Sequence, residues 1–283
     1  MTSRVFIVTG GLRGLGRAMA IGLAAGGHRV VAVGHLQQDV EPLLGDPKLA
    51  SCRDRIAPLV SDIRDPAACD RTVEAAFDRF GQLDGLINNA GLTFTYISPD
   101  GKGGPGPRFW EIADEITQNV INTNYVAAAQ MAKRVAAHLV PKGWGRIVNV
   151  TTKLETMNRP GTTPYGPSKA ALEMASEVWA KETAGTGVTV NILNPGAGAH
   201  TEGIAPELRK ASREGRLGRF IEPEEMVPPL LWLVSDAANP VNGMRFDANA
   251  WDATLPPAEA AARTGIPAGF RMKEKEAPPR ELD

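Results

Sequence analysis

A tyrosine and a lysine in this sequence have a spacing that suits proton transfer. In Tyr165-Gly-Pro-Ser-Lys169 a phenol and an ammonium stand four residues apart, which places them on one face of a helix. A nearby cation stabilises a phenolate and lowers the pKa of the tyrosine. Moving that pKa from about 10 to about 7 takes about 4 kcal/mol of differential stabilisation. Because such pairs are common on ordinary helix surfaces, their interpretation as a general acid/base depends on the rest of the chain.

A glycine-rich run, Thr9-Gly-Gly-Leu-Arg-Gly-Leu-Gly16, follows an apolar strand pattern and opens a helical one. Gly10, Gly14 and Gly16 let the backbone turn tightly and approach a pyrophosphate. The helix N-terminus then offers free N–H groups and the positive end of its dipole. Three glycines at this spacing, between a strand and a helix, predict a dinucleotide site. That site favours a chemical role for Tyr165 and Lys169.

The end of the second predicted strand bears on which nucleotide binds. A carboxylate there would hold a ribose diol and repel a 2′-phosphate. This strand ends Val33-Gly34-His35, no acid follows until Asp39, and Arg13 lies inside the phosphate loop. The pattern favours NADP(H) and leaves NAD(H) open. In the alternative interpretation, Arg13 caps the helix or faces solvent.

Short apolar runs alternate with longer helical patterns along the chain. Nearly continuous apolar runs are typical of strands in a parallel sheet covered on both faces. The predicted strands are 5–8, 29–33, 57–60, 83–87, 146–150 and 188–193, and the predicted helices are 15–25, 66–80, 110–139 and 164–183. Asp65 suits an N-cap, and Pro66 and Pro164 suit first helical turns. The alternation predicts one doubly wound α/β domain with helices on both faces of a parallel sheet.

Two segments depart from this alternation. Residues 93–108 contain Pro99-Asp-Gly-Lys-Gly-Gly-Pro-Gly-Pro107, which favours neither helix nor strand. The tail is rich in proline and alanine, with a short helix predicted over 257–263 and a solvated end over the last ten residues. We therefore assign residues 1–251 to the domain, with an excursion at 93–108, and 252–283 to a C-terminal extension.

Composition excludes several classes of protein. The 31 basic and 32 acidic residues give a net charge of -1, so nothing draws the chain toward nucleic acid or an anionic membrane. Cys52 and Cys69 are too few for a disulfide framework or a cysteine-rich zinc site, and we expect no metal. No signal peptide or run of 18 apolar residues is evident. We expect a cytoplasmic protein.

Taken together, these motifs resemble the short-chain dehydrogenase/reductase family, from about residue 4 to about residue 247. The resemblance rests on the phosphate loop, Asp62, Asn88-Asn-Ala-Gly91, Asn124, Gly145-Arg-Ile-Val-Asn-Val-Thr-Thr152, Tyr165-x-x-x-Lys169 and Pro195-Gly196. It implies a single Rossmann-type domain and hydride transfer between nicotinamide C4 and the carbon of a carbonyl or secondary alcohol.

The resemblance also implies catalytic roles. Tyr165 would be the acid in reduction and the base in oxidation, and Lys169 would bind the nicotinamide ribose and depress the tyrosine pKa. Asn124 matches the asparagine that holds a water in the proton relay, with Asn122 as the alternative. Thr152 takes the place of the usual serine, and its methyl group narrows the pocket. Thr151 is a weaker substitute, because strand alternation points it to the other face.

The expected cofactor contacts extend over several strand ends. They are Gly10, Leu12, Arg13, Gly14, Leu15, Gly16, His35, Asp62, Ile63, Asn89, Ala90, Gly91, Tyr165, Lys169, Pro195, Gly196 and Thr201. The spacing to Thr201 matches the family only approximately. His200 is better interpreted as a loop residue than as an acid/base, because Tyr165 already has that role. Where the family commonly has Gly-Gly after the seventh strand, this chain has Phe246-Asp-Ala-Asn-Ala-Trp251, so the last sheet edge and the adjoining substrate wall are expected to differ.

Substrate contacts are harder to assign. Phe94, Tyr96, Trp110 and Met157 are candidates, with Phe109 beside them. Local packing of the aromatic residues of 93–110 on a surface excursion is the alternative, and involvement in substrate access is favoured. The cations of 202–219 either form an opposing lid that attracts an acidic substrate or line a solvated helix; the second interpretation is favoured.

The leading hypothesis is an NADP(H)-preferring carbonyl reductase or alcohol dehydrogenase acting on a small molecule. A nucleotide-sensing protein without turnover is the alternative, and the trio Asn124, Tyr165 and Lys169 argues against it. Epimerisation or dehydration on the same fold is a third possibility. The family resemblance also implies a homo-oligomer, a dimer or homotetramer, with helices 110–139 and 164–183 in the interface.

Overall fold

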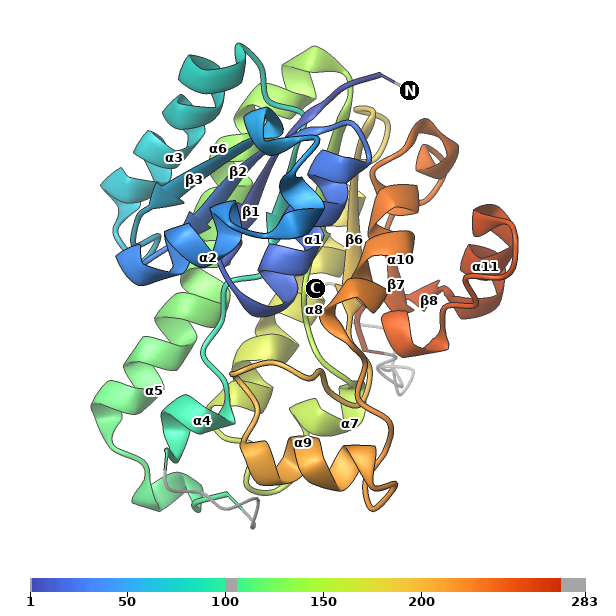
Figure 1. Cartoon of the computed structure of the whole chain (residues 1–283). Coiled ribbons are helices and arrows are strands. Elements are labelled where there is room, and N and C mark those ends of the chain that lie inside the picture. Colours follow the sequence, from blue (N-terminus) through green and yellow to red (C-terminus); the bar gives the residue numbers. More distant parts are fainter. Residues whose placement is uncertain (1, 100–105, 271–283) are drawn as a thin grey trace, which may run out of the picture.

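Eight strands form one sheet in the computed structural model, which describes residues 2–99 and 106–270 (Figure 1). Their order is β3-β2-β1-β4-β5-β6-β7-β8, and β8 pairs antiparallel with β7 while the other pairs are parallel. The strands are β1 Val5–Thr9, β2 Arg29–Gly34, β3 Ile56–Val60, β4 Gly85–Asn88, β5 Gly145–Asn149, β6 Val188–Asn194, β7 Met244–Asp247 and β8 Ile266–Pro267. The predicted doubly wound α/β fold is confirmed.

Helices cover both faces of this sheet, with α1 and α10 on one face and α3, α6 and α8 on the other (Figure 1). The helices are α1 Gly14–Ala25, α2 Val40–Leu44, α3 Pro66–Phe80, α4 Phe94–Ile97, α5 Asp114–Ile121, α6 Ala127–Lys142, α7 Leu154–Met157, α8 Tyr165–Glu182, α9 Pro206–Arg213, α10 Val227–Leu233 and α11 Pro257–Thr264. Each face has its own hydrophobic cluster.

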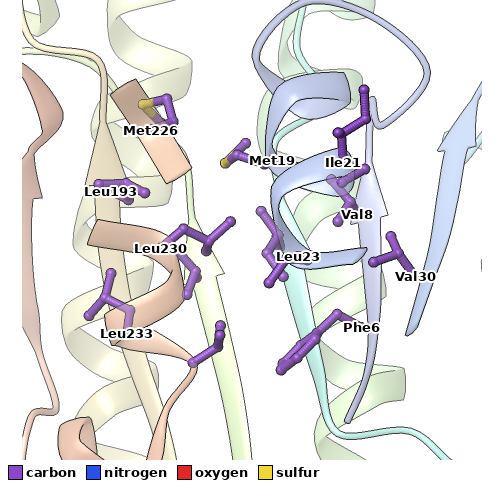
Figure 2. Close-up of a cluster of buried hydrophobic side chains, with 14 of the residues drawn as sticks. Phe6, Val8, Met19, Ile21, Leu23, Val30, Leu193, Met226, Leu230 and Leu233 are labelled. Atoms are coloured by element: carbon purple, nitrogen blue, oxygen red, sulfur yellow. The ribbon is translucent and has the colours of Figure 1, made fainter. Parts of the chain in front are cut away.

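Strand β1 shows why two clusters form. Phe6 and Val8 point toward α1 and α10, whereas Val5 and Ile7 point to the opposite face. Figure 2 shows the first cluster, in which Leu230 of α10 lies across from the α1 side chains. Burying such a side chain stabilises the fold by about 1.5–3 kcal/mol. The core therefore fixes the middle of the sheet and leaves the strand ends free for ligands.

The strand order reverses beside β1. The chain goes from β1 outward to β2 and β3, and then returns to place β4 on the other side of β1. In open α/β sheets, ligands bind at such a switch point, beyond the carboxyl ends of the strands. The predicted phosphate loop follows β1 and therefore lies at this position.

Local capping explains several helix ends. Asp65 accepts a hydrogen bond from the Ala67 N–H at 3.0 Å and Pro66 is the first residue of α3, as predicted. The helix predicted over 164–183 begins one residue later, and Pro164 precedes it.

The prediction of one long helix over 110–139 is wrong in two respects: its first residues are not part of the helix, and the rest is not a single α-helix. Phe109–Glu111 form a separate short turn, because the Glu111 carboxylate accepts the Arg108 N–H at 2.7 Å. Helix α5 begins at Asp114, and a π-helical stretch, Asn122–Val126, separates it from α6. This stretch carries one of the predicted catalytic residues.

The C-terminal part contains α11, as predicted, and then the two-residue strand β8. The last sheet edge therefore carries an additional strand, as the altered sequence there led us to expect. The domain boundary at residue 251 stays a prediction. The predicted solvated end and residues 100–105 of the excursion lie outside the described residues. Within the described part of the chain, no helix is long and apolar enough to cross a membrane.

Candidate active site

The carboxyl ends of the central strands gather most of the predicted site residues. Asp62 and Ile63 follow β3; Asn89, Ala90 and Gly91 follow β4; Thr152 follows β5; and Pro195 and Gly196 follow β6. Helix α8 begins with Tyr165, and its second turn brings Lys169 beneath the end of β5.

The phosphate loop is shaped by two glycines. Gly10 has a φ of +63°, which a residue with a side chain adopts only with strain, and a Cβ on Gly16 would lie 2.0 Å from the Gly10 oxygen. Asn89 Nδ2 donates to the main-chain oxygens of Thr9 and Gly10, at 3.0 and 3.3 Å. Helix α1 begins at Gly14, with no acidic residue in its first turn. The loop therefore offers the close approach and positive helix end that a pyrophosphate needs.

Two leucines of the loop have different surroundings. Leu12 is buried in the core beneath Gly34, so only its main chain is open to a cofactor. Leu15 lies in the first turn of α1 and packs partly buried against the same core. Their side chains support the loop rather than line it.

Arg13 lies at the rim of the nucleotide site. Its side chain is 55% exposed, and its Nε atom lies 3.8 Å from Asp39 Oδ2. His35 is exposed just after β2. The structure thus places the Arg13 cation beside Asp39, the first carboxylate after β2. Its contact with a 2′-phosphate stays a prediction.

Beyond β3, an arginine that the sequence analysis did not single out holds Asp62. Arg64 donates to the Asp62 carboxylate through Nε at 3.0 Å and through Nη2 at 2.6 Å. This side-chain hydrogen bonding holds the pKa of Asp62 below its ordinary value. Ile63 is buried, so its side chain supports the sheet rather than lining the site.

The π-helical stretch distinguishes the two candidate asparagines. Asn124 is buried; its Oδ1 accepts from the Leu92 N–H at 2.7 Å, and its Nδ2 donates to Leu92 O at 3.0 Å and Ser168 Oγ at 2.9 Å. Asn122 instead accepts from Gln118, within its own helical segment. Asn124 is therefore the asparagine that joins the loop after β4 to α8. Such π-helical stretches often occur at functional sites.

Tyr165, Lys169 and Thr152 come together at the start of α8. Lys169 Nζ donates to the Val150 oxygen at 2.8 Å, and a Cβ on Gly91 would lie 3.4 Å from that Nζ. The Thr152 hydroxyl lies close enough to the Tyr165 phenol to affect its pKa. The structure thus brings a phenol, a hydroxyl and an ammonium to the switch-point edge of the sheet.

Burial moves two pKa values in this group. It raises the pKa of Tyr165, and the hydrogen bond from Thr152 acts in the opposite direction. It lowers the pKa of Lys169, whose side chain is 4% exposed, to about 8. The predicted lowering of the tyrosine pKa is therefore wrong for the protein without cofactor, because loss of hydration outweighs the stabilisation of the phenolate.

The loop after β6 brings its threonine close to the phosphate loop. Gly196 N donates to Asn194 Oδ1 at 2.8 Å, which closes the turn around Pro195. Thr201 lies next to the phosphate loop: a Cβ on Gly14 would be 3.6 Å from Thr201 Cβ. The predicted contact of Thr201 with the cofactor stays a prediction.

Of the substrate candidates, Phe94 is beside the reacting group, with its ring 4.7 Å from that of Tyr165. Met157 is buried on α7. Tyr96 accepts a hydrogen bond from Asn119 of α5 at 2.8 Å, and Trp110 is 69% exposed with its ring packed on Phe109. The roles of Met157, Tyr96 and Trp110 stay predictions.

Hydroxyl groups join the two loops over the site. Thr93 Oγ1 and Thr95 Oγ1 donate to the Gly203 oxygen, at 2.6 and 3.3 Å.

Further out, Arg209, Lys210 and Arg213 of α9 line a surface hollow of about 490 Å³. His200 lies in the loop after β6, with its ring centroid 5.8 Å from that of Phe220.

Besides Arg64, three residues of this region were not predicted from the sequence. Ser168 bonds Asn124, and Glu173 and Arg245 form a buried ion pair. Glu173 follows Lys169 by four residues and so continues the face that begins with Tyr165, which is a signal that the sequence does contain. For Arg245, the signal is a single charge in the core-facing part of an otherwise apolar strand start.

Comparisons with known proteins give one family. A model described as short chain dehydrogenase matches residues 4–211. A 3-oxoacyl-(acyl-carrier-protein) reductase FabG from Thermotoga maritima is 28% identical over 247 residues, covering 86% of this chain and 95% of that protein.

Solved structures agree with this match. One is a 3-ketoacyl-(acyl-carrier-protein) reductase from Brucella melitensis complexed with NADH, with 26% identity, a TM-score of 0.74, and coverage of 86% of this chain and 96% of that one. Another is a putative NAD(P) dependent gluconate 5-dehydrogenase from Beutenbergia cavernae with bound NADP at low occupancy, with 28% identity, a TM-score of 0.74, and coverage of 88% and 96%. With the phosphate loop and the tyrosine–lysine pair in place, the chain belongs to the short-chain dehydrogenase/reductase family and is an NAD(P)-dependent oxidoreductase.

Proposed function

We propose that the protein is an NADP(H)-preferring carbonyl reductase or secondary-alcohol dehydrogenase with Tyr165 as its general acid/base. The observation that carries this proposal is the convergence of Tyr165, Thr152 and Lys169 beside Gly91 and the phosphate loop. The phosphate loop fits a dinucleotide, because its tight turn leaves no room for a side chain at Gly16, where a Cβ would collide with the Gly10 oxygen.

A nicotinamide cofactor bound here supplies the hydride for reduction or accepts it in oxidation. The Thr152 and Tyr165 hydroxyls hold the substrate oxygen between them. In reduction, Tyr165 gives its hydroxyl proton to that oxygen while the carbon gains the hydride; in oxidation, the tyrosinate takes the alcohol proton. Lys169, held by the Val150 oxygen, places a positive charge near the phenol and offers donors to a ribose.

Asn124 has a supporting part in this mechanism. Its side-chain amide is fully engaged by Leu92 and Ser168, so it holds the loop after β4 against α8. Through these contacts it keeps Gly91 beside Lys169. The predicted role of Asn124 in a proton relay stays a prediction.

A substrate panel tests the reaction. We expect NADPH-dependent turnover with at least one of several carbonyls, namely 3-oxoacyl thioesters, keto-sugar acids, cyclic diketones and aromatic ketones. The first two follow from the activities named for the similar proteins. Tight NADPH binding with no turnover across the panel would support the sensor instead, and substrate epimerisation without net cofactor consumption would support the third hypothesis.

Arg13 tests the cofactor preference. We expect Arg13→Ala to weaken NADPH binding by about 10- to 100-fold, because a hydrogen bond to a charged group contributes about 1.5–3 kcal/mol, and to leave NADH binding nearly unchanged. Isothermal titration with both nucleotides measures this. Arg17→Ala is the matched control, since Arg17 lies one turn further along α1 and bonds Asp46 at 2.7 Å. Equal losses for NADPH and NADH would remove the argument.

We further propose that the protein forms a homo-oligomer, a dimer or homotetramer. Phe109 and Trp110 support this, since both are 69% exposed and pack edge to face with centroids 5.0 Å apart beside α5. The cytoplasmic location stays a prediction.

A further inference from the structure

An arginine and a glutamate form a buried ion pair directly behind the site. Arg245 lies on β7 and Glu173 on α8, their side chains are 2% and 0% exposed, and Arg245 Nη1 lies 2.7 Å from Glu173 Oε2. Burying two charges costs several kcal/mol per ion, and apolar residues of similar volume often serve stability as well or better. Stability alone therefore gives no reason for this pair.

The pair holds the strand end that carries the proposed donor to the substrate oxygen. Arg245 Nη2 donates to the main-chain oxygen of Thr152 at 2.9 Å. Thr151 donates its hydroxyl to Glu173 Oε2 at 2.9 Å. The main chain of Thr152 and the side chain of Thr151 are thereby both held by this ion pair.

The same guanidinium is connected to the loop after β6. Arg245 Nη2 lies 3.4 Å from Asp247 Oδ1, and this oxygen accepts from Asn194 Nδ2 at 2.5 Å. Asn194 Oδ1 in turn accepts from Gly196 N at 2.8 Å. A continuous series of polar contacts therefore runs from the main chain of Thr152 to the main chain of Gly196.

The C-terminal segment completes the surroundings of the glutamate. Gly269, just after β8, donates its N–H to Glu173 Oε1 at 3.2 Å. A Cβ on Gly269 would lie 1.8 Å from Glu177 Oε2, so a side chain there would push this segment away. Both oxygens of the Glu173 carboxylate therefore have partners.

We propose that Arg245 is a positioning residue for hydride transfer, and that its pair with Glu173 sets the distance between Thr152 and Gly196. This rests on the proposed function, in which Thr152 faces the substrate and Gly196 the nicotinamide. Arg245 contacts neither ligand and acts through the Thr152 main chain and the Asp247 carboxylate. Because a 1 Å misplacement of reacting groups costs about 100-fold in rate, its loss lowers kcat rather than binding.

The test is the double variant Arg245→Met/Glu173→Gln, which removes both charges and leaves no unpaired ion in the core. We expect kcat to fall by about 10- to 100-fold, while substrate KM and NADPH affinity change by less than about threefold. Hydrogen–deuterium exchange of the cofactor-free protein gives a readout independent of turnover. Peptides covering 149–153 and 194–199 should both exchange faster, because the connection between them is cut.

Arg146→Met is the matched control. Arg146 is also a buried arginine, 1% exposed, and donates to main-chain oxygens of Gly145 and Ser235 at the other end of β5. This variant should lower the melting temperature without lowering kcat or changing exchange in 194–199.

Three results of the double variant would overturn the proposal. They are a kcat within about twofold of wild type, unchanged exchange in both peptides, or failure to fold. Failure to fold would show that the pair is needed for stability. If wild type reduces no carbonyl, the proposed function fails separately, and the exchange data still decide whether Arg245 links the two loops.

Discussion

Tyr165→Phe is expected to lower kcat by about 100- to 10,000-fold, the range over which a positioned general acid/base contributes to catalysis. The phenylalanine keeps the ring that packs on Phe94, so the helix start and the pocket wall are retained. Only the hydroxyl near Thr152 is lost. NADPH affinity should therefore stay nearly unchanged. Steady-state kinetics with a substrate from the panel, together with nucleotide titration, measure the two effects.

Tyr125→Phe provides the control, because it makes the same change in the π-helical stretch next to Asn124. We expect it to retain kcat near the wild-type value. A Tyr165→Phe enzyme with near wild-type turnover would show that another group moves the proton. A large loss of NADPH affinity in that variant would instead assign the phenol to cofactor binding.

Lys169→Met is expected to yield a protein that is more stable at neutral pH and nearly inactive. Burial lowers the pKa of Lys169 to about 8 from an ordinary 10.5. Below pH 8 the ammonium is charged in both folded and unfolded protein, so the fold carries the desolvation cost, about 3 kcal/mol at one unit per 1.36 kcal/mol. Methionine keeps the chain length and removes that charge. Losing the ammonium beside Tyr165 should lower kcat/KM by about 100-fold or more.

The pH dependence gives this prediction its sign. Between pH 8 and 10.5 the unfolded lysine is protonated and the folded lysine is not, so wild-type stability rises with pH through this window. The melting temperature of the variant should therefore exceed that of wild type most at pH 6.5 to 7.5, and the gap should narrow toward pH 10. Thermal melts without cofactor at several pH values test this.

Lys142→Met is the control for this series. The Lys142 side chain is exposed, and its ammonium forms an ion pair with the buried carboxylate of Asp84. We expect Lys142→Met to destabilise the protein, and we expect the difference in melting temperature between this variant and wild type not to narrow toward pH 10. A Lys169→Met protein less stable than wild type at pH 7 would mean that the Val150 hydrogen bond outweighs the desolvation of the ammonium.

The sequence predicted features that depend on neighbouring residues. Hydrophobic runs gave strands such as β1 within a residue of their observed bounds, and Asp65-Pro66 gave the start of α3. The phosphate loop and the pair Tyr165 and Lys169 could be predicted for the same reason, because their chemistry lies in short spacings. The structure brings both to one edge of the sheet.

Features that depend on distant contacts could not be predicted. The π-helical turn accompanies hydrogen bonds between Asn124 and Leu92, 32 residues apart in sequence. The direction of the Tyr165 pKa depends on burial, which spacing does not reveal. The link from Arg245 to Thr152 spans 93 residues. In each case the deciding partner comes from another element of the fold.

Strand β8 also determines how copies of this chain can associate. Without it, β7 would present unpaired N–H and C=O groups, to which a strand from another molecule can add. Ile266 and Pro267 occupy that edge by pairing with Arg245 and Met244. The new edge is two residues long and includes a proline, which has no N–H to donate. A strand from a second copy therefore cannot add directly to β7, which protects this edge of the sheet against open-ended strand addition.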